Sequence, residues 1–590
     1  AADRTDGGAR APALVDVADV RGAAGTVRAA GTVRAAGAVR ATGAVATESG
    51  GATSDPPVQR WRSPQHIALS ADGAFAWVAE HTADVVALVD LRARTVVAEV
   101  AVGAAPVFSL LAPAGDDLWV SCKEAGRVDV VEVASRKVVR SIATGDEPWG
   151  LAASADGASL YVANSLANDV SFIDPTSGAT LRRVPTGRQP RFLALTADGA
   201  LIVVSNSLAR AVTFIDVRRG ENVGTQRLGQ ASLLRGVALT PDGRHALVAH
   251  VVSHDEFATL QMERGFIHAN GFSVVDLHHP RRQHTTLLLD RLLAGAANPW
   301  GMAVSPDGKR LWVTLSGVHE VALVDLPAAL TVVADARTPA QRDALALDVE
   351  ILDRRGVARR VPAGGLGPRG LAWSRATGEL IVANYFSDSL SLLDGDTGAL
   401  RGQIELADTA RAKPDLRRRG ELLFNDARLC FQTWFSCTSC HEEDATVDAL
   451  NWDLPNDGLG NRKSAKSLHD VHDTAPAMWS GVRADMDACV AAGQRFLGAI
   501  PEPETHRALI AFVGDPHRPP NPHRGRDQAA ARRGALIFEA ARCHSCHAPP
   551  TYSDRRKHDP GLRGADDLRW RFDTPSLREC YRSAPYLHDG

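Results

Sequence analysis

Short runs in which apolar and polar residues alternate recur at a fixed distance through the middle of the chain. The run SLYVANSLANDVSFID, from Ser159, has the period of two β-strands joined by a tight turn. The tetrapeptide SADG and its variants TADG, TPDG and SPDG precede such runs as turn signals, at positions 70, 154, 196, 240 and 305. The prolines that open the first four units step by 42 residues: Pro64, Pro106, Pro148 and Pro190. A period of about 40–45 residues with four strand-like runs is typical of one blade of a β-propeller.

Counting these units along the chain predicts a seven-bladed propeller over residues 61–407. The units begin near Ser63, Ala105, Glu147, Gln189, Ser232, Asn298 and Gly367. Seven units close a ring without exposed sheet edges, which favours a propeller over an open sandwich. Units five and six carry insertions at 254–270 and 327–362, where we expect binding loops.

The segments around the propeller have other patterns. Residues 1–60 are rich in Ala, Gly and Arg and contain the near-repeat GTVRAA, so we expect a disordered leader. Residues 408–419 are polar and basic, which indicates a linker. Two amphipathic runs follow, RGELLFNDARLC from Arg419 and RRGALIFEAARC from Arg532. They predict two repeated helical domains, at 420–523 and 524–590, and we expect the second to be truncated at its C-terminus.

Each amphipathic run leads to a Cys-x-x-Cys-His motif, the spacing that attaches a c-type haem. Two thiols add to the haem vinyl groups, and the adjacent histidine binds the iron. The alternative is one zinc site made of two knuckles, but such knuckles usually lie about 15–20 residues apart. The motifs therefore predict two covalently bound haem c groups with His441 and His547 as iron ligands. The attachment residues are Cys437, Cys440 and His441 in the first motif and Cys543, Cys546 and His547 in the second.

Charge and apolar content narrow the function classes. The chain has 66 Lys and Arg residues and 69 Asp and Glu residues, which gives a net charge of −3. This balance provides no positive electrostatic potential that would attract nucleic acid. No run of about 18 apolar residues predicts a membrane span. Because haem c is attached outside the cytoplasm, we expect a periplasmic or otherwise extracytoplasmic protein whose export signal has been removed or left out. Four further cysteines allow one or two disulfides that sequence cannot pair: Cys122, Cys430, Cys489 and Cys580.

Several strings resemble known families. YVAN (Tyr161 to Asn164) and IVAN (Ile381 to Asn384) resemble the YVTN-type propeller repeat. CTSCH, AMWSGVR and FDTPSLRECYRSAPYLHDG together resemble the bacterial di-haem cytochrome c peroxidase family, which also contains the enzyme that matures the tryptophan-derived cofactor of methylamine dehydrogenase. The resemblance implies an all-β propeller followed by mainly α-helical di-haem cytochrome c domains.

This resemblance also implies residue roles. Trp479 matches the tryptophan that relays electrons between the two haems. The family's distal glutamate, which moves a proton during peroxide cleavage, falls nearest Glu502 or Glu504, although both fit equally as first-turn residues of the helix after Pro503. Asp485 and Asp487 are expected to be solvated. The family's calcium ion suggests four oxygen ligands: Asn461, Ser464, Thr574 and Ser576.

The sixth iron ligands stay open at the level of sequence. The second unit has no methionine, so either the chain is truncated or another side chain binds there; the candidates are Tyr552, His558, Tyr581, Tyr586 and His588. For the first iron, His469 and His472 are candidates, and an open, high-spin iron is the simpler hypothesis. In the propeller we expect surface or turn positions for His66, His250, His254 and His268, and core positions for Trp149 and Trp300.

Three functions compete. The first is a di-haem peroxidase or peroxidase-like oxidase that reduces hydrogen peroxide or uses it to oxidise a substrate, with an electron-donor protein or protein substrate docked at the propeller. The second is an electron-transfer cytochrome without peroxide chemistry, whose propeller binds or oxidises a small molecule or partner. The third is a non-enzymatic binding propeller with haems for electron exchange.

Overall fold

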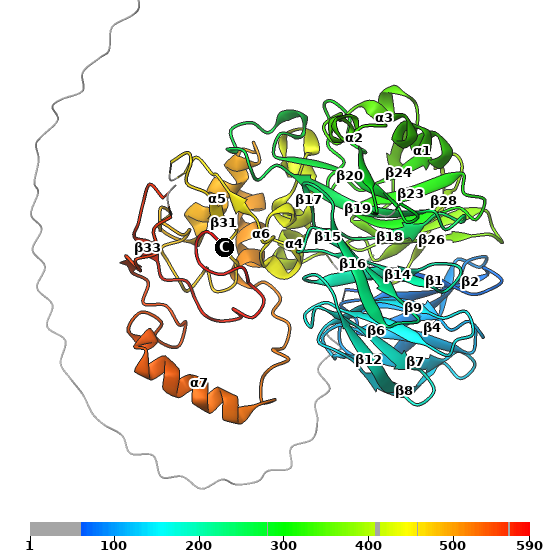
Figure 1. Cartoon of the computed structure of the whole chain (residues 1–590), viewed down its shortest axis with the longest axis horizontal. Coiled ribbons are helices and arrows are strands. Elements are labelled where there is room, and N and C mark those ends of the chain that lie inside the picture. Colours follow the sequence, from blue (N-terminus) through cyan, green and yellow to red (C-terminus); the bar gives the residue numbers. More distant parts are fainter. Residues whose placement is uncertain (1–60, 280, 408–412, 457, 565–566) are drawn as a thin grey trace, which may run out of the picture. The chain divides into compact units, whose positions relative to one another are not determined.

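The structure is a computed structural model that describes residues 61–590 except 280, 408–412, 457 and 565–566 (Figure 1). The predicted leader and residues 408–412 of the predicted linker lie outside the described residues. The described residues all belong to one compact unit. Seven antiparallel sheets follow one another along the chain, and this confirms the predicted seven-bladed propeller.

Each of the first four blades has four consecutive strands. Their bounds are β1 (Pro64–Leu69), β2 (Phe75–Glu80), β3 (Val85–Asp90), β4 (Thr95–Ala101), β5 (Pro106–Leu111), β6 (Asp117–Cys122), β7 (Arg127–Glu132), β8 (Lys137–Ala143), β9 (Pro148–Ala153), β10 (Leu160–Asn164), β11 (Asp169–Asp174), β12 (Ala179–Pro185), β13 (Pro190–Leu195), β14 (Leu201–Asn206), β15 (Ala211–Asp216) and β16 (Glu221–Arg227).

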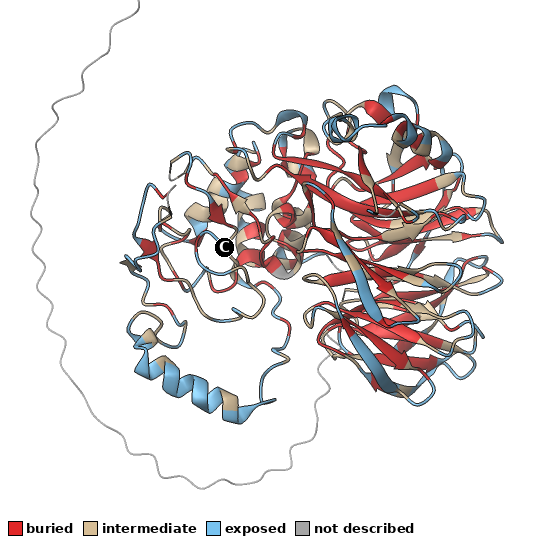
Figure 2. Ribbon diagram, viewed as in Figure 1, coloured by how far each residue is buried: buried red, intermediate tan, exposed pale blue. Residues whose placement is uncertain are grey.

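The last three blades are β17–β21, β22–β25 and β26–β29. Their bounds are β17 (Ala231–Ser232), β18 (Val237–Leu239), β19 (His245–Ser253), β20 (His268–Asp276), β21 (His284–Leu288), β22 (Pro299–Val304), β23 (Arg310–Leu315), β24 (Glu320–Asp325), β25 (Ala358–Pro362), β26 (Pro368–Ser374), β27 (Glu379–Asn384), β28 (Ser389–Asp394) and β29 (Leu400–Glu405). Buried apolar residues of neighbouring sheets pack together around the ring (Figure 2).

The recurring Ser-x-Asp-Gly turn has a simple physical basis. In the first blade, Asp72 Oδ1 accepts hydrogen bonds from Ser70 Oγ at 2.5 Å and from the Ala74 amide at 3.0 Å. Gly73 follows with φ +68°, a left-handed conformation that glycine adopts without a steric penalty. Ser154 and Asp156 repeat the side-chain bond at 2.6 Å. Each such turn therefore reverses the chain between the first two strands of a blade.

Both predicted insertions have a structure. The first lengthens β19 and β20 and leaves the loop 254–267 between them, and Ile267 packs with Trp434 and Phe435 of the C-terminal region (residues 413–590). The second contains α1 (Leu326–Asp335), α2 (Pro339–Leu345) and α3 (Ile351–Arg354) before β25 completes its blade. Asp325 and Thr338 cap the first two of these helices through side-chain oxygens.

The C-terminal region has four α-helices among its described residues, joined by long irregular segments. They are α4 (Leu416–Asn425), α5 (Met486–Phe496), α6 (Pro503–Gly514) and α7 (Gln528–Ala540). Two short strand pairs, β30 (Asn451–Trp452) with β31 (Lys463–Ser464) and β32 (Lys557–His558) with β33 (Phe572–Asp573), order the segments between them. Helix α4 packs on α6, whereas α7 buries none of its residues (Figure 2).

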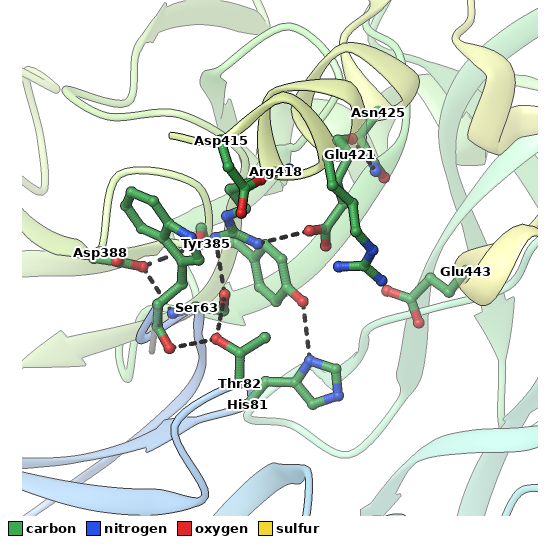
Figure 3. A network of polar contacts seen from close by, with 12 residues as sticks. Ser63, His81, Thr82, Tyr385, Asp388, Asp415, Arg418, Glu421, Asn425 and Glu443 are labelled. Atoms are coloured by element: carbon green, nitrogen blue, oxygen red, sulfur yellow. Dashed lines mark hydrogen bonds and ion pairs between the residues drawn. The ribbon is translucent and has the colours of Figure 1, made fainter. Parts of the chain in front are cut away.

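Helix α4 also contacts the chain at the first blade and at the last blade, where the ring closes (Figure 3). Its Arg418 donates from Nη2 to Ser63 Oγ at 2.9 Å, in front of the first blade, and to the Tyr385 carbonyl at 3.0 Å, in the last blade. The Ser63 amide donates to Asp388 Oδ1 at 2.8 Å across the same junction. The first and last blades and the C-terminal region therefore share one buried polar network.

Candidate functional site

The first Cys-x-x-Cys-His motif opens into a cavity. A single 3₁₀ turn, Cys437–Ser439, folds the motif, and the His441 amide donates to the Cys437 carbonyl at 2.9 Å. The cavity has a volume of about 520 Å³, and Cys437, Cys440 and His441 all line it. The rest of its wall is mainly apolar, as a porphyrin pocket requires.

The electrostatics of His441 suit a metal ligand. Burial lowers the pKa of His441 to about 4, so the imidazole is neutral. Its buried Nδ1 has no hydrogen-bond partner among the described residues. Two thiols and a neutral imidazole beside an apolar cavity are the residues that attach and ligate a haem, so the first motif fits that group.

Trp479 lines the same cavity. Its indole Nε1 donates to the Ser464 carbonyl at 2.8 Å, and the Lys466 ammonium lies 5.3 Å from its ring centroid. These contacts fix the indole on the cavity wall, on the segment between β31 and α5. The arrangement brings together the motif and the tryptophan that sequence analysis selected.

The second motif is more exposed. A 3₁₀ turn, Cys543–Ser545, follows α7, and His547 Nδ1 lies 2.9 Å from the Tyr552 carbonyl oxygen. Donation from Nδ1 leaves Nε2 of His547 for a metal. Cys546 also lies near Asp554 and His558, whose side chains are 2.7 Å apart. Because Cys546 belongs to the motif, we read this group as part of the same site.

Glu502 and Glu504 lie elsewhere. Neither is among the described residues that line the cavity. Glu502 is the residue before α6, and Glu504 is in its first turn, 65% exposed and ion-paired with Arg419 at 3.2 Å. The structure therefore shows the helix-start arrangement that the sequence left open. Asp485 and Asp487 lie at the start of α5, where Asp485 caps the helix.

The four proposed calcium ligands make separate contacts. Asn461 Oδ1 accepts from the Lys463 ammonium at 2.6 Å, and that ammonium also meets Asp567 at 2.6 Å. The other three bond elsewhere: Ser464 to the Leu587 carbonyl, Thr574 to the Arg556 carbonyl, and Ser576 to Asp470 and the Thr551 carbonyl. The Lys463 ammonium therefore already binds the Asn461 amide oxygen that was proposed as a calcium ligand.

The candidate sixth ligands are mostly engaged. His469 bonds Glu579 at 2.6 Å, and His588 bonds Asp567 at 2.7 Å. Met478 and Met486 were not among the candidate ligands of the first iron, yet both line the cavity of the first motif. Both methionines lie within seven residues of Trp479 in the sequence, and this closeness could have indicated that they line the same cavity.

Three propeller histidines, His250, His254 and His268, are buried, which corrects their predicted surface or turn placement. His250 bonds Ser273 Oγ of the neighbouring strand at 2.8 Å inside its own blade, whereas His268 is covered by the C-terminal region. His268 Nε2 lies 3.4 Å from Cys440 Sγ, and its ring packs 4.9 Å from Trp452. Burial lowers the pKa of His268 to about 3, so this ring is neutral.

Carboxylates next to the first motif reach the centre of the propeller. Glu442 and Glu443, which follow His441 directly, pair with Arg191 at 3.1 Å each. Glu443 also pairs with Arg369 at 3.1 Å. Burial raises the pKa of Glu443, but the cations Arg369 and Arg191 outweigh it, so the pKa stays below its usual range. The predicted core tryptophan Trp149 stacks on Arg191, 4.6 Å from the guanidinium.

A smaller cavity of about 340 Å³ lies between the propeller and α4. Arg369, Tyr385 and Glu443 line it together with Phe424 of α4, which also lines the larger cavity. Tyr385 donates to or accepts from His81 Nδ1 at 2.9 Å (Figure 3).

The remaining cysteines are free thiols: Cys122, Cys430, Cys489 and Cys580. Among the described residues, no helix has the length and apolar character that crossing a bilayer requires.

Known proteins match different parts of the chain. The family profile described as YNCE-like beta-propeller matches residues 151–249. A solved structure of Kuenenia stuttgartiensis hydrazine synthase aligns with a TM-score of 0.55 at 30% identity, covering 58% of this chain and 99% of that chain.

Two relatives extend the comparison. The hydrazine synthase subunit gamma of Kuenenia stuttgartiensis is 29% identical over 236 residues, covering 30% of this chain and 67% of its own. The methylamine utilization protein MauG of Methylophilus methylotrophus is 25% identical over 224 residues, covering 29% of this chain and 67% of its own. The chain is thus similar to two differently named proteins.

Proposed function

This chain joins a seven-bladed β-propeller to a region of the bacterial di-haem cytochrome c peroxidase family, and from that premise we propose that it is an extracytoplasmic di-haem oxidoreductase that reacts with hydrogen peroxide. It either reduces peroxide or uses it to oxidise a substrate. The observation that carries the proposal is the cavity that Cys437, Cys440, His441 and Trp479 line together.

The residues have separate tasks in this proposal. Cys437 and Cys440 hold the first haem, His441 binds its iron through a neutral imidazole, and the equivalent residues of the second motif hold the other haem. A bound haem supplies an iron that exchanges electrons with peroxide. Trp479, fixed by Ser464, provides an aromatic group on the cavity wall through which electrons reach that site.

The propeller is the proposed docking surface for an electron-donor protein or a protein substrate. The part of it around Arg191 and Arg369 is already occupied by the chain's own Glu442 and Glu443. We therefore place the partner on the remaining propeller surface. Calcium is not carried into this proposal, because Lys463 takes the position next to Asn461.

A second candidate is electron transfer without peroxide chemistry. It is favoured by the position of Glu502 and Glu504, since neither lines the cavity as a distal acid and base would. Addition of peroxide to the half-reduced, haem-loaded protein separates the two functions. Optical and electron paramagnetic resonance changes that Trp479→Phe slows would support the peroxidase, whereas spectra that ignore peroxide would favour electron transfer alone.

A further inference from the structure

One position per blade points its residue to the inner ring of the propeller. It is the second residue of a blade's first strand in most blades, and Arg235 holds the corresponding place in the fifth. Because the first strands of successive blades contact one another around the ring, these residues surround the central axis. The set is Gln65, Val107, Trp149, Arg191, Arg235, Trp300 and Arg369. Three arginines therefore converge on one side of this ring.

The arginines face the two carboxylates that follow the iron-binding histidine. Arg191 Nη1 lies 3.1 Å from Glu442 Oε1 and 3.1 Å from Glu443 Oε2, and Arg369 Nη1 lies 3.1 Å from Glu443 Oε1. Ser207 Oγ adds a hydrogen bond to Glu442 at 2.8 Å. The side chains of Arg191 and Glu442 are 3% and 0% exposed. A buried ion pair holds its partners firmly, because separating them leaves an uncompensated charge.

The charges in this cluster do not balance. Three guanidinium groups and the buried Lys123 ammonium act on these two carboxylates. The fully buried Arg235 side chain makes one described hydrogen bond, from Nη1 to the Pro299 carbonyl at 3.3 Å. Nε and Nη2 of Arg235 have no partner among the described residues. Trp300 lies between two of the cations, with Arg235 and Arg369 each 4.2 Å from its ring centroid. Positive charge therefore remains in excess in a buried site next to the first motif.

We propose that Arg191 and Arg369 are positioning residues for His441, and that the excess positive charge of this propeller cluster raises the reduction potential of the haem held by the first motif. The inference rests on the proposed haem attachment at Cys437, Cys440 and His441, but not on peroxide chemistry. Its electrostatic part follows from Coulomb's law: a buried cation favours the reduced iron, which carries one positive charge less.

The second motif supplies an internal control. His547 is followed by Ala548 and Pro549, so this motif has no carboxylates in the corresponding positions. It is also partly exposed, where solvent weakens the effect of distant charges. Changes in the propeller cluster are therefore expected to shift one haem potential and leave the other in place.

The test is a redox titration of the haem-loaded full chain in three variants. Arg369→Gln removes a positive charge and is expected to lower the potential of the first haem. Glu443→Gln removes a negative charge with almost no change of shape and is expected to raise it. Arg369→Lys keeps the charge and should leave the potential near that of the wild type. A purely structural role would not give shifts of opposite sign.

The outcomes separate this inference from the proposed function. Suppose both haems are attached, but the potential of the first haem stays unchanged in Arg369→Gln and Glu443→Gln, or moves in the same direction in both. That result would overturn this inference and leave the proposed function standing. If Arg369→Gln does not fold, Glu443→Gln still decides, because a potential that does not rise contradicts the proposal. A haem stain and pyridine haemochrome count that find no haem on the first motif would overturn both.

Discussion

His268 Nε2 lies 3.4 Å from Cys440 Sγ, so a strand of the propeller touches a cysteine of the first motif. The ring is fully buried between Phe435 and Trp452. We expect His268→Ala to leave a cavity at this contact and to lower the free energy of unfolding by about 3 kcal/mol. Denaturant unfolding of the full chain measures this. The exposed His278→Ala is the matched control, and an equal loss in both variants would contradict the interpretation.

Acid should destabilise the propeller as the pH falls below about 6.5, down to about pH 4 for His250 and about pH 3 for His268. Burial lowers the pKa of His250 to about 4 and of His268 to about 3, from an ordinary value of 6.5. Below pH 6.5 the unfolded chain therefore binds protons that the folded chain does not, and stability falls by about 1.4 kcal/mol per pH unit for each such histidine. Unfolding curves at several pH values measure the slope. In His250→Gln the slope should be smaller; an unchanged slope would show that other groups cause it.

Chelators should not alter stability, because a lysine ammonium takes the place of a cation between Asn461 and Asp567. Lys463→Met would leave the buried Asp567 carboxylate without this partner, at a cost of about 3 kcal/mol. The exposed Lys309→Met should have little effect. Thermal unfolding with and without EDTA checks the first point. A lower midpoint of the wild type in EDTA would instead support a bound divalent metal.

Equivalent glycines in the two helical repeats should respond in opposite ways to alanine. A Cβ on Gly420 of α4 would lie 1.9 Å from the Ala508 carbonyl oxygen of α6, whereas a Cβ on Gly534 of α7 meets nothing within 4 Å. We expect Gly420→Ala to destabilise by about 2 kcal/mol or more, through forced separation of the helices. Gly534→Ala should stabilise α7 by about 0.5–1 kcal/mol, through helix propensity. Circular dichroism during thermal unfolding follows both, and a loss in Gly534→Ala would show that α7 is packed.

Local signals predicted much of this molecule. The turn around Asp72 and Gly73 depends on four neighbouring residues, so it could be recognised at five positions, and the step of about 42 residues between units gave the number of blades. The spacing of Cys437, Cys440 and His441 is likewise local. The structure adds that these residues share a cavity with Trp479, whose identity came from the family resemblance.

Contacts between distant segments were beyond these signals. Arg191 and Glu443 are 252 positions apart, and no periodicity connects them. His268 belongs to an insertion that interrupts the blade repeat, so its burial depends on what packs above it. Glu504 has the right distance along the chain from Trp479, but it lies in the first turn of α6, exposed beside Arg419. Tertiary packing therefore decides the burial of His268 and the partner of Arg191, which no local pattern specifies.

The junction between the first and last blades has a consequence for the order of assembly. Strands β1–β4 form one blade and β26–β29 another, so in the described chain each of these blades is continuous in sequence. Such blades can form one after another during synthesis, as soon as their own residues emerge. Arg418, however, ties Ser63 to Tyr385 from outside the ring. The propeller ring is therefore completed late, by helix α4 of the C-terminal region. Ring closure and formation of the site around the first motif then become a single folding event.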